Sequence, residues 1–141
     1  MADSGSPSEL HQVQLNTVGL ERVTAGLRSA AGDDTLSVKI PKTILRTSNA
    51  DRTDFTCSVR TVVSVPLGGR SWRADVTVRG TFSSDGGLTV RQLRFFVQTS
   101  ALYVLWPFAR TYVDQLATLS GVVAPPLPLI VRRPTPEDPL E

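Results

Sequence analysis

The 141-residue chain is long enough for one domain and carries a net charge of +2, with 40% apolar and 20% charged residues, a composition typical of soluble globular proteins. Thirteen arginines outnumber two lysines, but no basic segment is interleaved with aromatic residues, so nucleic-acid binding is not predicted. The single cysteine, Cys57, excludes an internal disulfide and favours the reducing cytoplasm. The sequence predicts neither a membrane span nor a secretory signal, since no apolar run approaches 18 residues and "MADSGSPSEL" lacks a signal peptide's apolar middle.

The first ordered segment is predicted to be a bulged strand. Residues 1–10 are small and polar and are expected to be disordered. Along 11–27, apolar residues alternate with a period of two in short groups, and the phase slips between groups, as β-bulges would cause. A helix is the alternative, because residues at every seventh position also share a face. Gly19 and Gly26, together with the Val and Thr content, argue against it.

Residues 36–52 are predicted to begin as a strand and to continue as a loop. Leu36, Val38 and Ile40 alternate with polar residues, and Pro41 then interrupts the pattern. The rest of the segment is polar apart from two adjacent apolar residues.

The clearest local pattern is an antiparallel hairpin over 54–82. Apolar residues occupy alternate positions in each half, and Gly68-Gly69 can adopt the positive φ of a tight primed turn. Folding there places both apolar faces on the same side, while arginines, Asp75, Ser and Thr lie on the other, solvated side. The predicted pairs are Val65 with Trp72, Val63 with Ala74, Val59 with Val78 and Phe55 with Phe82.

From Val90 to Leu119 the apolar period lengthens to three or four residues, which predicts a helical stripe. The helix is expected to be either continuous or in two pieces joined near Ser100, and to stop at Ser120-Gly121.

Pro107 interrupts this helix between two large rings, Trp106 and Phe108. A kink there can present the two rings on different sides, although both can also be plain core. The segment 122–141 holds six of the ten prolines and is predicted to be extended.

The sequence contains no group of residues arranged as in a typical catalytic site. The aspartates at 33–34, 51 and 54 lie in turn-like polar stretches, and the only histidine, His11, has no motif around it. Cys57 falls on the buried face of the hairpin, where it acts as a small hydrophobe. We therefore expect no catalysis, no cofactor and no metal, but a binding role.

Several collinear segments resemble the SecB export chaperones. "VLWPFART" is similar to the start of that family's long helix, "HQVQL" to its first strand, and "LSVKIPKTILRTSNADRTDFTCSVRTVV" to the second strand, crossover loop and following strand. "VPLGGRSWRADVTVRGTFS" resembles the next hairpin, and "VVAPPLPL" the proline-containing stretch after the helix. The resemblance covers roughly 11–131, which is expected to form one domain, with 132–141 as a Pro-rich flexible tail.

The resemblance implies an α+β fold, with a four-stranded antiparallel sheet packed against one long helix, assembled as a dimer or dimer of dimers. It also implies an ATP-independent cytoplasmic holdase that binds unfolded client proteins and reaches the membrane only through a partner such as SecA. In the family, the proline lies near the start of the long helix.

Two departures from the family pattern change these expectations. The Pro-rich end, "IVRRPTPEDPLE", replaces the family's second helix, so the client groove should be more open. The chain is net basic where the export chaperones present an acidic sheet face to SecA. A dedicated antitoxin chaperone, from a toxin–antitoxin–chaperone system, is therefore an alternative within the family. Another class of protein, a small α+β barrel that binds an apolar small molecule, is a further alternative.

A holdase needs an exposed apolar surface. For each candidate the alternative is a place in the core or a subunit interface. The residues expected to line the peptide-binding surface are Ile40, Ile44, Leu45, Tyr103, Trp106, Leu127, Leu129 and Ile130.

Overall fold

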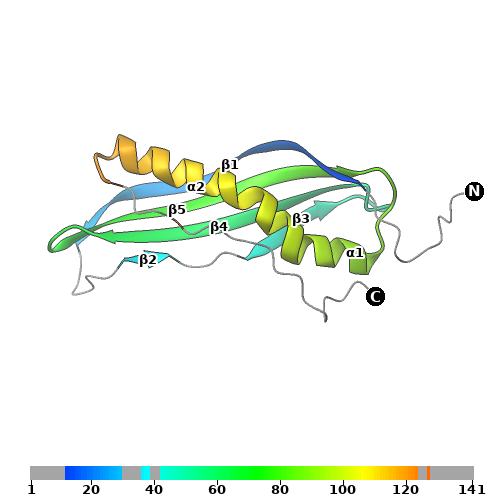
Figure 1. Ribbon diagram of the computed structural model, residues 1–141, viewed down its shortest axis with the longest axis horizontal. Helices are drawn as coiled ribbons and strands as arrows, with labels where there is room; N and C mark the ends of the chain where they lie inside the picture. Colours follow the sequence, from blue (N-terminus) through cyan, green and yellow to red (C-terminus); the bar gives the residue numbers. More distant parts are fainter. Residues whose placement is uncertain (1–11, 30–35, 39–41, 124–126, 128–141) are drawn as a thin grey trace, which may run out of the picture.

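The computed structural model describes residues 12–29, 36–38, 42–123 and 127, which form the expected α+β structure in two layers (Figure 1). One layer is an antiparallel sheet in the order β1-β5-β4-β2, with β3 also paired to β4. The other is a helical segment that crosses one face of the sheet (Figure 1). The elements are β1 Val13–Ser29, β2 Ser37–Val38, β3 Thr43–Ser48, β4 Asp54–Pro66, β5 Arg70–Ser84, α1 Val90–Phe95, the π-helical turn Phe96–Ser100 and α2 Ala101–Leu119.

Several predicted features lie outside the described residues. These are the terminal segments 1–10 and 132–141 and three candidate groove residues, Ile40, Leu129 and Ile130. No helix in the described ranges is long and apolar enough to cross a membrane.

The hairpin of β4 and β5 has the predicted register. Val65 lies opposite Trp72, and Phe55 lies opposite Phe82. Gly68 and Gly69 have φ values of 58° and 82°, the left-handed conformation that a primed two-residue turn requires. The pattern of alternating apolar residues and the glycine turn therefore fixed this register together.

The prediction of a bulged strand is confirmed for β1. It pairs with β5 along its whole length, with register shifts between Leu15 and Thr17 and between Leu20 and Arg22. Each shift adds one residue to β1, which restores its apolar residues to the same face as those of β5.

The expectation of a loop after Pro41 is wrong for residues 43–48, which form β3. This strand pairs with one half of the outer edge of β4, and β2 pairs with the other half. The fourth strand position of the predicted sheet is thus shared by two short strands. Without β2 and β3, the backbone donors and acceptors on the outer edge of β4 would be unpaired. Residues 43–48, which include β-branched Thr and Ile, can form the strand that pairs with this edge. In the described residues the sheet is open, with β1 at one edge, and the barrel alternative is wrong.

The helical segment runs from Val90 to Leu119, and the expected joint near Ser100 is a π-helical turn. Thr89 and Gln92 form a capping box at the start of α1, which satisfies two otherwise free backbone donors. Apolar residues of the stripe recur every four residues through this joint, and a turn wider than that of an α-helix keeps them facing the sheet. Gly121, with φ of 73°, ends the helix as predicted.

Pro107 lies inside α2 rather than near the start of the helix, contrary to the family pattern. Its ring removes the backbone donor that would reach the carbonyl of Tyr103. The two neighbouring rings lie on different sides of the helix: Trp106 is 2% exposed, in the core, whereas Phe108 is 36% exposed.

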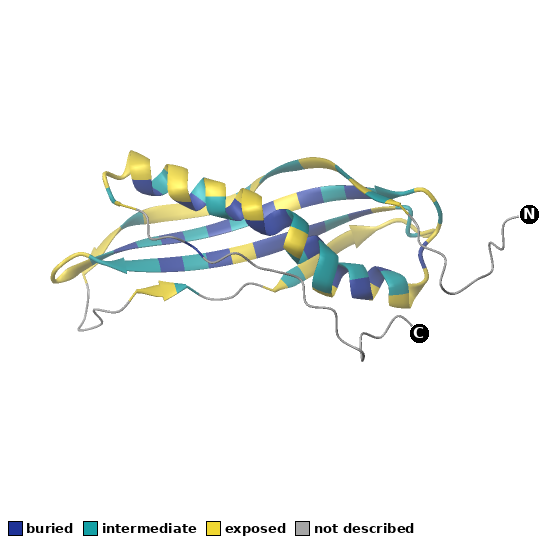
Figure 2. Ribbon diagram, in the orientation of Figure 1, coloured by how far each residue is buried: buried dark blue, intermediate teal, exposed yellow. Residues whose placement is uncertain are grey.

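The core lies between the sheet and the helical segment, where burial is concentrated (Figure 2). Phe55 and Phe82 stack with ring centroids 5.6 Å apart, and Phe96 from the π turn packs edge-on against both. Gly80 lies under Leu105, and an added Cβ there would approach the Leu105 Cδ2 atom to 2.7 Å. The helix therefore packs close to the middle of the sheet.

Candidate functional site

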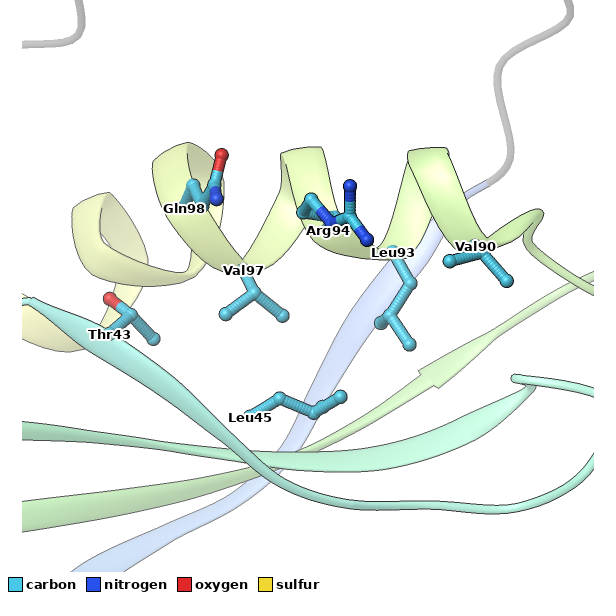
Figure 3. A pocket seen from close by; sticks show the side chains of 7 residues that line it. All are labelled: Thr43, Leu45, Val90, Leu93, Arg94, Val97 and Gln98. Atoms are coloured by element: carbon cyan, nitrogen blue, oxygen red, sulfur yellow. The ribbon is translucent and has the colours of Figure 1, made fainter.

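An apolar groove lies between β3 and the first half of the helical segment, with a volume of about 310 Å³. Figure 3 shows Leu93 and Val97 directed from the helix toward Leu45 on the strand. Leu45 pairs with Cys57 of β4, so its side chain lies on the helix-covered side of the sheet. The residues that line the groove are Thr43, Leu45, Val90, Leu93, Arg94, Val97 and Gln98.

The apolar lining of this groove is partly exposed. Leu93 and Val97 are each 6% exposed, whereas Leu45 is 39% and Val90 57% exposed. The latter two side chains keep apolar surface in water because β3 is short and no further element covers them among the described residues. Burying such a side chain against a ligand contributes about 1.5–3 kcal/mol.

Two kinds of polar group accompany the apolar lining. The Thr43 hydroxyl oxygen is shielded from solvent and has no hydrogen-bond partner among the described residues. Arg94 and Gln98 are exposed and add charged and amide donors to the lining.

No reactive thiol accompanies the groove. Cys57 is fully buried beneath it, and burial raises the pKa of its thiol to about 12. The thiol therefore stays protonated at neutral pH and packs as a small hydrophobe, as its place on the hairpin predicted.

The structure separates the candidate residues proposed from the sequence. Leu45 lines the groove, but Ile44, 55% exposed, points to the opposite face of the sheet. Tyr103 is 49% exposed on α2. Placing Trp106 on the surface was wrong, because it is buried in the core, and Leu127 is also buried at 9% exposure.

Sequence reasoning missed the helical wall of the groove. Val90, Leu93 and Val97 belong to the apolar stripe that the sequence predicted for the helix, but none of them was named as a candidate for the peptide-binding surface. One feature of the sequence could have indicated this wall. Val90 lies at the very start of the stripe, where a short strand would not cover its side chain.

Comparison with known proteins supports the fold but gives no sequence family. No family model matches the chain, and no curated protein sequence matches it. Among solved structures, the SecB-like chaperone Rv1957 of Mycobacterium tuberculosis, in complex with a ChAD peptide from the Rv1956 HigA1 antitoxin, matches with a TM-score of 0.68 and 18% identity, over 84% of this chain and 88% of that one. A protein of unknown function from Streptococcus agalactiae matches with a TM-score of 0.47 and 6% identity, over 79% of this chain and 91% of that one. The chain therefore has a SecB-like α+β fold.

Proposed function

We propose that this protein is a chaperone without enzymatic activity, which binds an unfolded segment of a client polypeptide in the groove between β3 and the helical segment. The observation that carries the proposal is the groove itself, in which half-exposed Leu45 and Val90 flank a buried apolar floor. The SecB-like fold supports the same reading. We place the activity in the cytoplasm, as the cysteine content and the family resemblance predict.

Binding of this kind needs no nucleotide. Apolar side chains of an unfolded segment leave water when they enter the groove, and the released free energy depends on the area buried rather than on hydrolysis.

The test is suppression of client aggregation in the absence of ATP, followed by light scattering. We expect suppression near stoichiometric ratios. Val90→Asp should remove most of it, because the charge would face the apolar groove, while an acid at the first position of α1 is tolerated by the helix dipole. Val123→Asp is the matched control, since Val123 is 89% exposed and lies outside the groove lining. Equal activity of the two variants would exclude the groove as the client site.

A dedicated antitoxin chaperone is the second candidate. It is favoured by the solved structure of similar fold, which holds an antitoxin peptide. Measuring the affinity for one antitoxin peptide beside a panel of unrelated unfolded proteins separates the two: a single tight client indicates the dedicated role, whereas similar affinities indicate a general holdase. Delivery of precursors to SecA would require, in addition, a direct complex of the two purified proteins.

We also propose that the protein is a homo-oligomer, a dimer or a dimer of dimers. Apolar side chains stay exposed on the helix-covered side of β1, including Leu20, Val23 and Leu27, and on α2 at Phe108. Exposed apolar side chains grouped on one face are typical of subunit interfaces. A monomeric mass at micromolar concentration in light-scattering chromatography would contradict this assembly.

A further inference from the structure

The face of the sheet that points away from the helix is rich in arginine. Alternation along the strands places Arg73 and Arg79 of β5 and Arg60 of β4 on this outer face. Three carboxylates share it, those of Glu21 and Asp75 near its centre and that of Asp54 at one end. The arginines of the outer face are Arg22, Arg28, Arg46, Arg60, Arg73 and Arg79.

The two central carboxylates are already engaged. Arg60 donates to both oxygens of Asp75, from Nε at 3.0 Å and from Nη2 at 2.6 Å. Glu21 accepts from the Ser58 hydroxyl at 2.7 Å and, through its other oxygen, from Arg46. Glu21 also attracts Arg79, and Asp75 attracts Arg73 and Arg22, but neither carboxylate forms an ion pair or a hydrogen bond with these arginines in the described residues.

Four arginines of this face form no ion pair with a carboxylate in the described residues: Arg22, Arg28, Arg73 and Arg79. Arg79 makes only a long contact of 3.5 Å to the Thr56 hydroxyl. The Nε atom of Arg73 is shielded from solvent and has no hydrogen-bond partner there. An arginine without a carboxylate partner gains charge-assisted hydrogen bonds when a carboxylate binds to its guanidinium group.

The outer face also has room for a ligand. A hollow of about 290 Å³ lies on this face, and its lining includes Arg22, Glu21 and Asp75 but neither Arg73 nor Arg79. Directly opposite Arg73 and Arg79, the β1 residues are Gly26 and Gly19, and a Cβ added to either would meet no atom within 4 Å. The surface above the arginines is therefore open.

We propose that the outer face of the sheet is a docking surface for an acidic peptide segment of a partner protein, whose carboxylates pair with Arg22, Arg73 and Arg79. Charge complementarity selects this occupant. A second copy of the chain would bring its own arginines against these, which is unfavourable. The docking surface is separate from the groove, since the two lie on opposite faces of the sheet.

A nucleic acid fits this face less well than a peptide. A phosphate backbone carries its charges at regular, close intervals, and Glu21 and Asp75 would repel it in the middle of the patch. The outer-facing residues of β4 and β5 also include no aromatic ring on which a base could stack. A peptide can place carboxylates over the free arginines and an apolar residue over Ile44.

The proposal is tested with the full-length protein and a fluorescent oligoglutamate, whose binding is followed by anisotropy. We expect binding that weakens as salt rises from about 50 mM to about 0.3 M, and a loss of at least about tenfold in affinity for R22Q/R73Q. The control R91Q/R110Q removes the same charge from the helical segment and should change the affinity less than about twofold. Circular dichroism melting checks that both variants are folded.

Three outcomes would overturn the proposal. Equal losses in the two variants would show that only net charge attracts the probe. Tighter binding of single-stranded DNA of the same length, with the same dependence on Arg22 and Arg73, would identify a nucleic-acid surface instead. A rise in oligoglutamate affinity when Glu137, Asp138 and Glu141 are neutralised together would show that the chain's own acidic end occupies the face.

Discussion

Ile44 and Leu45 are neighbours on β3, yet their side chains lie on opposite faces of the sheet: Leu45 lines the apolar groove and Ile44 lines the arginine-rich hollow. Each is more than a third exposed, at 55% for Ile44 and 39% for Leu45. A charge at either position can therefore reach water, so neither substitution should unfold the protein.

These neighbours allow a crossed test of the two binding surfaces. Leu45→Asp should abolish most of the aggregation suppression and leave oligoglutamate affinity unchanged. Ile44→Asp should do the opposite, since its carboxylate would lie among arginines and compete with the acidic probe. Loss of both activities in either variant would mean that the two surfaces are not independent.

The register of the hairpin predicts a contrast between two adjacent residues of β4. Val63 is fully buried, and Asp at this position should unfold the protein because the charge would be buried without a partner. Ser64 faces outward, directly opposite Arg73. Asp there should raise the stability slightly, by about 0.2–1 kcal/mol, through a cross-strand pair of opposite charge. Urea denaturation of both variants measures the difference, and similar losses would show that the face assignment is wrong.

The hairpin shows how much of the fold could be predicted from sequence. Its register depends on local features, the alternation in each strand and two adjacent glycines, and these agree with the tertiary structure. β3 could not be predicted in the same way. Residues 43–48 become a strand because β4 offers a free edge, and that edge belongs to a residue range later in the sequence.

The candidate site was predicted less well, for a related reason. Periodicity assigns Val90 and Leu93 to one helical face, but it does not tell how far the facing strand extends, and this decides which apolar residues stay exposed. Likewise, Pro107 suggested that its two flanking rings face different sides, but not which of them is buried. Only the packing of α2 on the sheet places Trp106 inside and Phe108 outside.

The acidic groups of the outer face predict how stability depends on pH. Hydrogen bonds from Ser58 and Arg46 lower the pKa of Glu21 below its ordinary value of 4.5, and the Arg60 pair lowers the pKa of Asp75 below 3.8. Both groups bind protons more readily when unfolded, so their contribution is present above these values and is lost as pH falls through the lowered pKa values. The melting temperature should therefore fall more steeply below about pH 4.5 in the wild type than in E21Q/D75N. Parallel curves for the two proteins would contradict this account.

The buried ring beside Pro107 predicts a large loss of stability. Trp106→Ala should cost about 3–5 kcal/mol, because a large side chain leaves the core between α2 and the sheet. Phe108→Ala is the control, since this ring is 36% exposed, and it should cost much less. Comparable losses in urea denaturation would show that both rings are core.

Substitution of Pro107 compares the cost of a proline to the helix with its possible benefit to the packing of α2 on the sheet. It lies in the interior of α2, where a proline is about 3 kcal/mol less favourable than alanine. The helix continues through this position and still packs Leu105 and Ala109 fully into the core. Because the surrounding turns already have helical geometry, Pro107→Ala should restore the bond to the Tyr103 carbonyl and raise the melting temperature. A lower melting temperature would show instead that the proline improves the fit of α2 to the sheet, and that this packing outweighs its cost to the helix.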